Sequence, residues 1–548
     1  MARAVLPPVP SPIVEVEAGG AARQGERLAV VHAGPDALTE AGYPHADLAA
    51  DLHVTGKAGE VVDVPVTALT ARPSGARSAG AASSGAMSSG TASSTAPSST
   101  AASSTAASST APSSAAESVG DGAPMPTWFV GVGDGEPARY RSAGAALVRA
   151  AHALAEAESD AGRRVPSQVA VQLPAGVDAE QAAAFTTGVV LGGYRFRVTG
   201  EKPKPAVTAV RFDGEPDEEL TAAVARAREV AAASALARDL ANAPSNVKNP
   251  AWLADVAARV AEQTRGLTAT IRDETWLAEQ AFGGMLAVGG GSASPPRLIE
   301  LAYRPRGATS HLLLVGKGIT FDTGGISIKP AAGMHLMRTD MAAGGAVIAA
   351  MRAIAALRLP VKVTALVPAA ENHVSGSAYR PGDIVRHYGG RTSEVGNTDA
   401  EGRMVLADAL GYGIQRFRPD AVVDVATLTG AMKVALGLRT GGVFATDDAL
   451  AESVCAAGDR AGEQWWRMPL LEDHMGDVRS EIADVKQAAP GPGGVTAALF
   501  LREFAGGLPW AHLDIAGPAR AEKTYDEVVP GGTGFGARTL VELAASYS

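Results

Sequence analysis

Apolar runs and amphipathic stretches alternate along most of this chain. In the N-terminal part, short apolar runs predict strands, and alanine-rich segments predict helices. The predicted strands are residues 28–32, 61–66, 127–132 and 169–173, and the predicted helices are residues 145–157 and 179–191. Strands that alternate with helices in this way favour a small α/β domain.

The alternation resumes after a helical pattern that runs from Asp217 to Leu240. Apolar runs predict strands at residues 312–315, 361–367 and 421–425, with helices at residues 343–356 and 402–416 between them. The run from Leu312 to Val315 has no polar position, which is typical of a strand buried on both faces. We therefore predict a central, mostly parallel sheet flanked by helices, with its functional site beyond the carboxyl ends of the strands.

One segment breaks the pattern and sets the predicted domain organisation. From Ser78 to Ala116 the chain contains only Ser, Ala, Thr, Gly, Pro and one Met. Such a tract buries too little apolar surface to offset the entropy lost on ordering, so residues 74–124 are predicted to be a disordered insertion. The 548 residues then divide into a smaller N-terminal α/β domain over residues 1–205 that carries the insertion, a connecting helix over 206–236, and a C-terminal α/β domain over 237–548.

Charge and cysteine content narrow the function classes. The formal net charge of −10 disfavours nucleic acid as a partner, because phosphate binding relies on an excess of Lys and Arg. Cys455 is the single cysteine, so neither an intrachain disulfide nor a cysteine metal cluster can form, which fits a reducing compartment. Prolines interrupt the N-terminus before an apolar signal region forms, and no apolar run reaches the roughly 18 residues of a membrane span. We expect a cytoplasmic protein without membrane contact.

Two lysines and an aspartate stand out in the glycine-rich segment after the strand 312–315. Its spacing does not match a phosphate-binding loop of the form GxxxxGK[ST]. Taken singly, Lys317 and Lys329 read as solvated loop residues. Lysine, however, can lose its proton when it is buried or lies beside a metal, which arginine cannot do.

Four acidic residues suggest a metal site. Taken alone, Asp340 reads as a helix N-cap, and Asp399 and Glu401 read as acids that complement a helix dipole. Together with Asp322 they supply four negative charges. Clustered carboxylates without metal would repel one another and raise their pKa values. The set is therefore sensible for a two-metal hydrolytic site.

Several long segments resemble the leucyl aminopeptidase (cytosol aminopeptidase) family of dinuclear-metal aminopeptidases. The segment from Asn397 to Leu410 resembles the family signature, and residues 315–330, 370–372, 375–383, 424–431 and 510–517 resemble other family motifs. The resemblance is close from about Arg238 to the C-terminus and weak before it.

The resemblance implies a complete set of site residues. It implies the metal ligands Lys317, Asp322, Asp340, Asp399 and Glu401, the catalytic pair Lys329 and Arg403, and the substrate-binding residues Met337, Asn397, Thr427, Leu428 and Gly430. In the family, Asp322 and Glu401 would bridge the metals, Lys317 would bind as a neutral amine, and Asp399 would bind partly through its backbone carbonyl.

The resemblance also implies the chemistry. Two divalent metal ions per subunit, Mn²⁺ or Zn²⁺, would activate a bridging hydroxide that attacks the scissile carbonyl. Lys329 would stabilise the oxyanion, and Arg403 would hold a bicarbonate that acts as general base. The substrates would be peptides with a free N-terminal amine, with leucine and other large apolar residues preferred, and the assembly would be a homo-hexamer.

Two other readings remain open at this stage. A dinuclear phosphoesterase could also use clustered Asp, but such sites generally recruit histidine, and none of the matched ligand positions is a His. The other is a DNA-binding or scaffolding role on the aminopeptidase fold, and the net charge of −10 argues against it.

The chain departs from the family pattern at two places. The small residues from Ala342 to Gly345 stand in reversed order, and Pro490 and Pro492 are expected to alter the pocket rim. His335 is predicted to lie on the surface.

Overall fold

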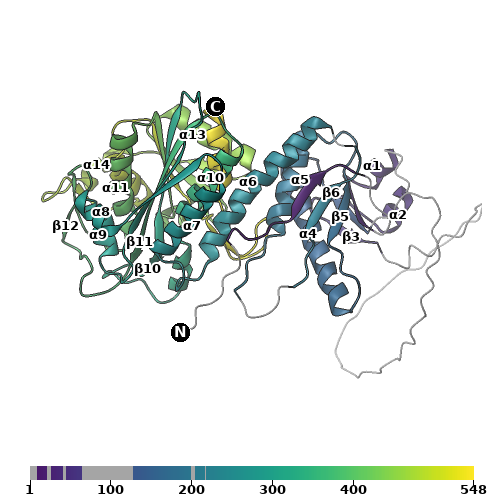
Figure 1. The fold of residues 1–548 in the computed structure, drawn as a ribbon, viewed down its shortest axis with the longest axis horizontal. Coiled ribbons are helices and arrows are strands. Elements are labelled where there is room, and N and C mark those ends of the chain that lie inside the picture. Colours follow the sequence, from purple (N-terminus) through teal and green to yellow (C-terminus); the bar gives the residue numbers. More distant parts are fainter. Residues whose placement is uncertain (1–8, 21–25, 41–44, 65–126, 199–203, 216) are drawn as a thin grey trace, which may run out of the picture.

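The computed structural model describes residues 9–20, 26–40, 45–64, 127–198, 204–215 and 217–548. The predicted insertion at 74–124 lies outside the described residues. Two large sheets organise the rest, one of six strands and one of nine, and helix α6 (Glu218–Asn242) lies between them (Figure 1). The prediction of an α/β fold with a mostly parallel sheet flanked by helices is confirmed.

The six-stranded sheet has the order β1-β6-β5-β2-β4-β3. Its strands are β1 (Glu15–Ala18), β2 (Arg27–His32), β3 (Val61–Asp63), β4 (Trp128–Gly131), β5 (Gln168–Gln172) and β6 (Ala209–Phe212). Only β3 runs antiparallel to its neighbour among these described strands. The helices of this part are α1 (Pro35–Glu40), α2 (Ala46–Asp51), α4 (Pro137–Asp160) and α5 (Ala179–Gly192). The strands and helices predicted for this part are present in the described residues. The strand predicted at 61–66 is observed over 61–63, and residues 65 and 66 lie outside the described residues.

The segment predicted as a connecting helix differs from expectation. Within 206–236, Ala209–Phe212 forms β6, which pairs with β1 and β5, and the helix begins only at Glu218. The helix begins there because the Asp217 side chain accepts a hydrogen bond from the Leu220 backbone N–H at 2.6 Å, as an N-cap does. The domain boundaries at 205 and 237 stay a prediction.

The nine-stranded sheet has the order β16-β15-β18-β14-β9-β11-β8-β7, and β10 pairs with β11 beside this path. Its strands are β7 (Leu267–Arg272), β8 (Arg297–Tyr303), β9 (His311–Gly316), β10 (Gly318–Asp322), β11 (Lys362–Asn372), β14 (Ala421–Ala426), β15 (Thr440–Ala445), β16 (Gln464–Arg467) and β18 (Trp510–Asp514). The central strands β11, β9, β14 and β18 are parallel. Every residue of β9 and β14 is buried, as strands covered on both faces require.

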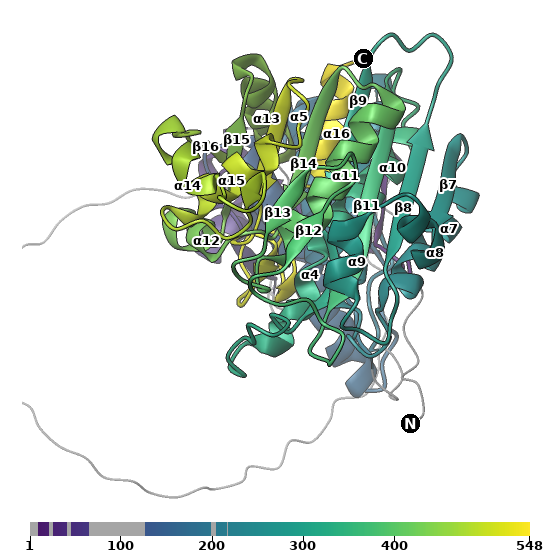
Figure 2. The ribbon, with the colours of Figure 1, turned by 90° about the vertical axis from the view of Figure 1, so that its left-hand side faces the viewer.

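Helices cover both faces of this sheet (Figure 2). One core joins the sheet to α6, α7 (Pro250–Gln263), α10 (Ala342–Ala356), α13 (Asp448–Ala461) and α16 (Ala537–Ser546). The other core joins it to α8 (Glu274–Glu279), α9 (Gly283–Gly289), α11 (Glu401–Phe417), α12 (Gly430–Leu436) and α15 (Gly493–Arg502). The shorter elements are the 3-10 helices η1 (Met334–Thr339) and η2 (Glu472–His474), helix α14 (Met475–Val478) and strands β12 (Ile384–Arg386), β13 (Thr392–Glu394), β17 (Val485–Lys486), β19 (Arg520–Ala521) and β20 (Gly531–Gly532).

One helical stretch among the described residues, Met334–Ala356, is long and apolar enough to cross a membrane by composition. Its most apolar window is 89% buried inside the protein. It therefore occupies the position of a core helix.

A buried histidine makes folding stability depend on pH. His152, 4% exposed in α4, accepts a hydrogen bond at Nδ1 from the Val207 N–H at 3.1 Å, so the neutral ring carries its proton on Nε2. Burial lowers the pKa of His152 to about 4. Because its folded pKa lies below its unfolded value, the unfolded state binds more protons between about pH 6.5 and 4, and stability is lost as the pH falls through that window.

We expect acidification from pH 7.5 to pH 5 to lower the melting temperature, with His152 contributing at most about 3 kcal/mol of the loss over its full titration. The variant His152→Gln should show a shallower decline with pH. The exposed His373→Gln should decline as steeply as the parent. Equal slopes for the parent and His152→Gln would contradict this assignment.

Candidate active site

The predicted metal ligands come from separate elements that meet at the carboxyl edge of the nine-stranded sheet. Lys317 stands between β9 and β10, and Asp322 ends β10. Asp340 follows η1, and Glu401 is the first residue of α11. This edge is where sites of open α/β sheets lie.

Four of the five predicted ligands lie close together. Oxygen atoms of Asp322, Asp340 and Glu401 all lie within 4.8 Å of one another, and the three residues are 1%, 7% and 2% exposed. The Lys317 Nζ atom lies 2.8 Å from Asp340 Oδ1 and 2.9 Å from Glu401 Oε1. Asp340, taken alone, read as a helix N-cap. In the structure Met341 is the N-cap of α10, and the Asp340 carboxylate bonds to Lys317 in the cluster instead.

The fifth predicted ligand reaches the cluster through Lys329. The Lys329 Nζ atom lies 2.7 Å from Asp322 Oδ2 and also forms an ion pair with Asp399. The Asp399 side chain is 31% exposed, whereas that of Asp322 is 2% exposed. Asp399 and Lys329 therefore lie at the solvent side of the buried carboxylates.

The electrostatics of the cluster show a shortage of positive charge. Burial, with Glu401 and Asp340 nearby, raises the pKa of Asp322 well above its ordinary value. Burial also raises the pKa of Asp340 to about 6, although Lys317 opposes the shift. In the described structure, Asp340 Oδ2 is buried without a hydrogen-bond partner. The same carboxylates raise the pKa of Lys317, although burial opposes the shift, so Lys317 is their counter-charge in the described structure. Converging carboxylate oxygens, one of them unpartnered, form a donor set that fits divalent cations.

Residues outside the predicted set hold the ligands in place. Asn372 Nδ2 donates to Asp322 Oδ1 at 2.8 Å and to the Thr398 carbonyl at 2.9 Å. The Tyr379 hydroxyl donates to the same carbonyl at 2.9 Å. The sequence carried a signal for both, because Asn372 and Tyr379 lie in the motifs at 370–372 and 375–383, but the motifs alone do not show what their side chains contact.

Asp514 fixes the loop that carries three predicted substrate-binding residues. Its carboxylate, 1% exposed, accepts hydrogen bonds from the Leu428 N–H at 3.2 Å and from the Thr429 N–H at 3.0 Å. The Thr427 hydroxyl lies 2.7 Å from Asp340 Oδ1, so this loop lies against the cluster. Asp514 was missed as a site residue, although it lies in the motif at 510–517.

The other predicted substrate-binding residues lie around this edge in different settings. Met337 is half-buried in η1, three residues before Asp340. Asn397 is exposed, and its Oδ1 accepts a hydrogen bond from the Asp399 N–H at 2.9 Å. Gly430 is exposed at the first position of α12. Their roles as substrate contacts stay predictions.

Arg403 is a buried cation near the cluster, on the first turn of α11. Its side chain donates to the Gln487 carbonyl at 2.7 Å, and its Nε atom is buried without a partner among the described residues. Burial lowers the pKa of Arg403 to about 10, a shift that the charges of Glu401 and Asp514 oppose. A guanidinium with a free, desolvated N–H is suited to hold a small anion.

The departures from the family pattern have simple positions. His335 is exposed, in agreement with the predicted surface location. Gly344 donates its backbone N–H to the Lys317 carbonyl at 2.9 Å, and a Cβ there would lie 2.7 Å from Val367. Pro492 precedes the first turn of α15. The effect of the two prolines on the pocket rim stays a prediction.

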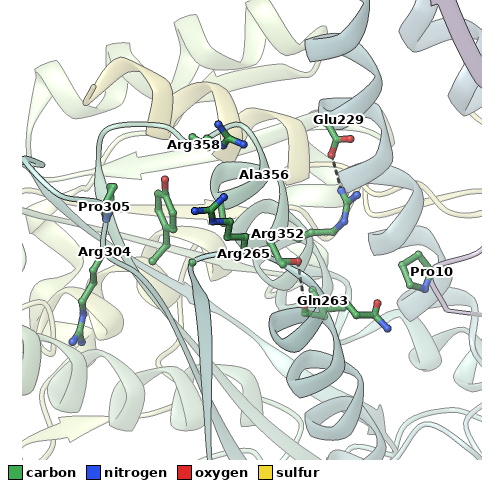
Figure 3. Close-up of a pocket in the computed structure, with 14 residues that line it drawn as sticks. Pro10, Glu229, Gln263, Arg265, Arg304, Pro305, Arg352, Ala356 and Arg358 are labelled. Atoms are coloured by element: carbon green, nitrogen blue, oxygen red, sulfur yellow. Dashed lines mark hydrogen bonds and ion pairs between the residues drawn. The ribbon is translucent and has the colours of Figure 1, made fainter.

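A cavity of about 690 Å³ lies elsewhere, at the ends of α7 and α10, and contains none of the predicted site residues (Figure 3). Arg265, Arg304, Arg352 and Arg358 are among its lining residues, and Arg352 forms an ion pair with Glu229 at 3.2 Å.

A glycine beside Lys317 gives a sharp test of the geometry. A Cβ at Gly402 would lie 2.6 Å from Lys317 Cε and 2.9 Å from its Nζ. Helix propensity alone predicts that Gly402→Ala stabilises α11 by about 1 kcal/mol. We expect the steric conflict to prevail and to displace Lys317. The rate of the reaction at this site should then fall at least about tenfold, as it does when a contact that orients a metal ligand is lost.

The matched control is Gly411→Ala on the same helix, where the nearest atom to a Cβ would be the Tyr388 carbonyl oxygen at 3.3 Å. Steady-state kinetics and thermal unfolding of both variants separate the two effects. Full activity in a stabilised Gly402→Ala variant would contradict the described packing.

The chain is similar to known proteins over the region that contains this site. The model of the "Cytosol aminopeptidase family, catalytic domain" matches residues 235–541. A probable cytosol aminopeptidase of Syntrophotalea carbinolica is 47% identical over 383 residues, which cover 68% of this chain and 76% of that protein. A probable cytosol aminopeptidase of Streptomyces coelicolor is 45% identical over 421 residues, 73% of this chain and 80% of that protein. The solved structure of the bottromycin maturation enzyme BotP in complex with Mn has a TM-score of 0.75 and 35% identity, and covers 95% of this chain and 99% of that one.

Proposed function

We propose, from the premise that this chain belongs to the cytosol aminopeptidase family, that it is a metal-dependent exopeptidase that releases leucine and other large apolar residues from peptide N-termini. Membership makes it a hydrolase that acts on peptides. The observation that carries the proposed metal dependence is the buried contact of Lys317 with Asp340 and Glu401, with Asp322 in the same cluster.

Lys317, Asp322, Asp340, Asp399 and Glu401 would hold two divalent cations, Mn²⁺ or Zn²⁺. When bound, the cations would supply Lewis acidity, which lowers the pKa of water and makes it a nucleophile for the scissile carbonyl at neutral pH. The chain itself supplies the converging carboxylates, and the cations would supply the positive charge that these carboxylates lack. A structure of a similar protein, BotP, holds Mn, which supports a metal in this site.

Lys329 and Arg403 would act on the peptide and on the proton. The Lys329 ammonium lies beside Asp322. Burial opposes the charged form, but the carboxylates of Asp322 and Glu401 prevail and raise the pKa of Lys329. It therefore stays charged at neutral pH and can stabilise a developing oxyanion. Arg403, with its free Nε, would hold a bicarbonate as general base, since the nearby carboxylates would hold cations.

The remaining proposed roles concern selectivity. The free N-terminal amine of the substrate would approach the cation site. Met337 and Thr427 would line the pocket for the first side chain, where a flexible thioether packs against large apolar groups. Asn397, Leu428 and Gly430 would contact the peptide backbone.

The proposal extends to assembly and location: a homo-hexamer in the cytoplasm, with residues 1–205 and 237–548 as its two domains. The family match and the similar proteins give no support to a DNA-binding or scaffolding role.

Hydrolysis of leucine p-nitroanilide tests this proposal, with its N-acetyl derivative as the matched control. We expect turnover of the free amine substrate, its loss after treatment with a chelator, and its return on addition of Mn²⁺ or Zn²⁺. The acetylated substrate should be turned over poorly, because its amine is blocked. Equal turnover of both substrates, or full activity in excess chelator, would refute the proposal.

A further inference from the structure

A fully buried lysine outside the predicted site connects two elements near the cation site. Lys248 lies between α6 and α7 and is 1% exposed. Its Nζ atom donates to the carbonyls of Leu240 at 3.0 Å and Ala241 at 2.9 Å, at the end of α6, and also to the carbonyl of Arg338 in η1.

This arrangement is costly, which indicates a specific role. A buried ammonium loses its hydration, and neutral carbonyls compensate for that loss less well than a carboxylate does. No ion pair of Lys248 exists within the described residues. The last carbonyls of a helix are commonly satisfied by water or by a glycine C-cap motif, so capping α6 does not require a lysine. The bond to Arg338 is what the lysine adds.

The third bond acts on the segment that carries Asp340. Apart from it, the side-chain and loop hydrogen bonds of residues 331–339 in the described structure close within residues 331–340. Arg338 is two residues before Asp340, whose Oδ1 faces Lys317. Met337, the predicted pocket residue, is the neighbour of Arg338 in η1. Lys248 therefore ties η1 to α6, a helix of the main core.

We propose that Lys248 is a positioning residue: by holding the Arg338 carbonyl against the end of α6, it sets where Asp340 presents its carboxylate to the cation site. The proposal rests on the proposed function, because it assumes that Asp340 is a metal ligand. Among the described residues, no hydrogen bond or ion pair joins Lys248 to the cluster, so it is not a catalytic residue.

The test is Mn²⁺ binding to metal-stripped, full-length protein, measured by calorimetry for the parent, Lys248→Met and Lys248→Gln. Methionine keeps the apolar stem and removes every donor. Glutamine keeps one amide donor for the α6 carbonyls at shorter reach and loses the bond to Arg338. We expect both variants to bind Mn²⁺ about 10–100-fold more weakly, as when a residue that orients a ligand is lost. Their activity should recover in excess Mn²⁺.

The control is Lys362→Met at the start of β11, which should bind Mn²⁺ as the parent does. If Lys248 only caps α6, its variants would melt at lower temperature while the folded protein keeps the parent's Mn²⁺ affinity, and the proposal would be wrong. If Lys248→Met does not fold, Lys248→Gln decides by the same criterion. A parent protein that binds no Mn²⁺ would overturn the proposed function and this inference together.

Discussion

Replacing Glu401 with alanine is expected to lower kcat/KM for leucine p-nitroanilide by more than about 100-fold, beyond the 10–100-fold typical of residues that only orient a ligand. Glu401 is 2% exposed, and its Oε1 lies 2.9 Å from Lys317 Nζ. The substitution removes a carboxylate from the centre of the cluster and leaves Lys317 with Asp340 as its one remaining ion-pair partner among the described residues. Both losses act on the cation site.

The matched control is Glu300→Ala. Glu300 is also buried and ion-paired, but its partner is Arg272 at 2.9 Å, between β8 and β7. We expect this variant to melt at lower temperature and to keep its activity and metal content. Parent-like kinetics in Glu401→Ala would show that the cluster is not the reaction site.

The second large effect is expected for Lys329→Met. Loss of a preorganised donor to a developing oxyanion lowers kcat by roughly 10²–10³-fold. Methionine preserves the length of the stem and removes the charge that faces Asp322 and Asp399. Because bound cations would still neutralise those carboxylates, we expect the variant to retain metal and a KM close to the parent's.

Kinetics and metal analysis of the same preparation distinguish the two roles that Lys329 can have. A fall in kcat with full metal content supports a direct role in the reaction. A loss of metal with unchanged kcat per metal-loaded chain would show that Lys329 serves only to balance charge.

The hydrophobic pattern of the sequence was sufficient to predict helices and buried strands wherever one regular spacing of apolar residues runs through the whole element. The run from Leu312 to Val315 became β9, and the helical stripe in residues 402–416 became α11. It failed for β6, where four residues join a sheet whose other strands lie far away in sequence. Pairing with β1 and β5 overrides what local pattern shows there.

The residues of the site also fall into those that the sequence could predict and those that it could not. Residue types alone suggested a metal site at Asp322, Asp340 and Glu401, and the resemblance to the family added Lys317. The structure brings these four residues together. Asn372 and Asp514 could not be assigned roles, because their contacts with Asp322 and with the 427–429 loop join residues that are 50 and 85 or more positions apart. Lys248 was missed for the same reason.

The central claim is that the cluster around Glu401 is a dinuclear metal site that performs peptide hydrolysis. The most direct test titrates metal-stripped protein with Mn²⁺ and measures both bound metal and leucine p-nitroanilide hydrolysis. The account predicts two ions per chain, activity that rises as they bind, and no comparable binding by Glu401→Ala. Full hydrolysis by metal-free protein, or equal Mn²⁺ binding by the parent and Glu401→Ala, would contradict it.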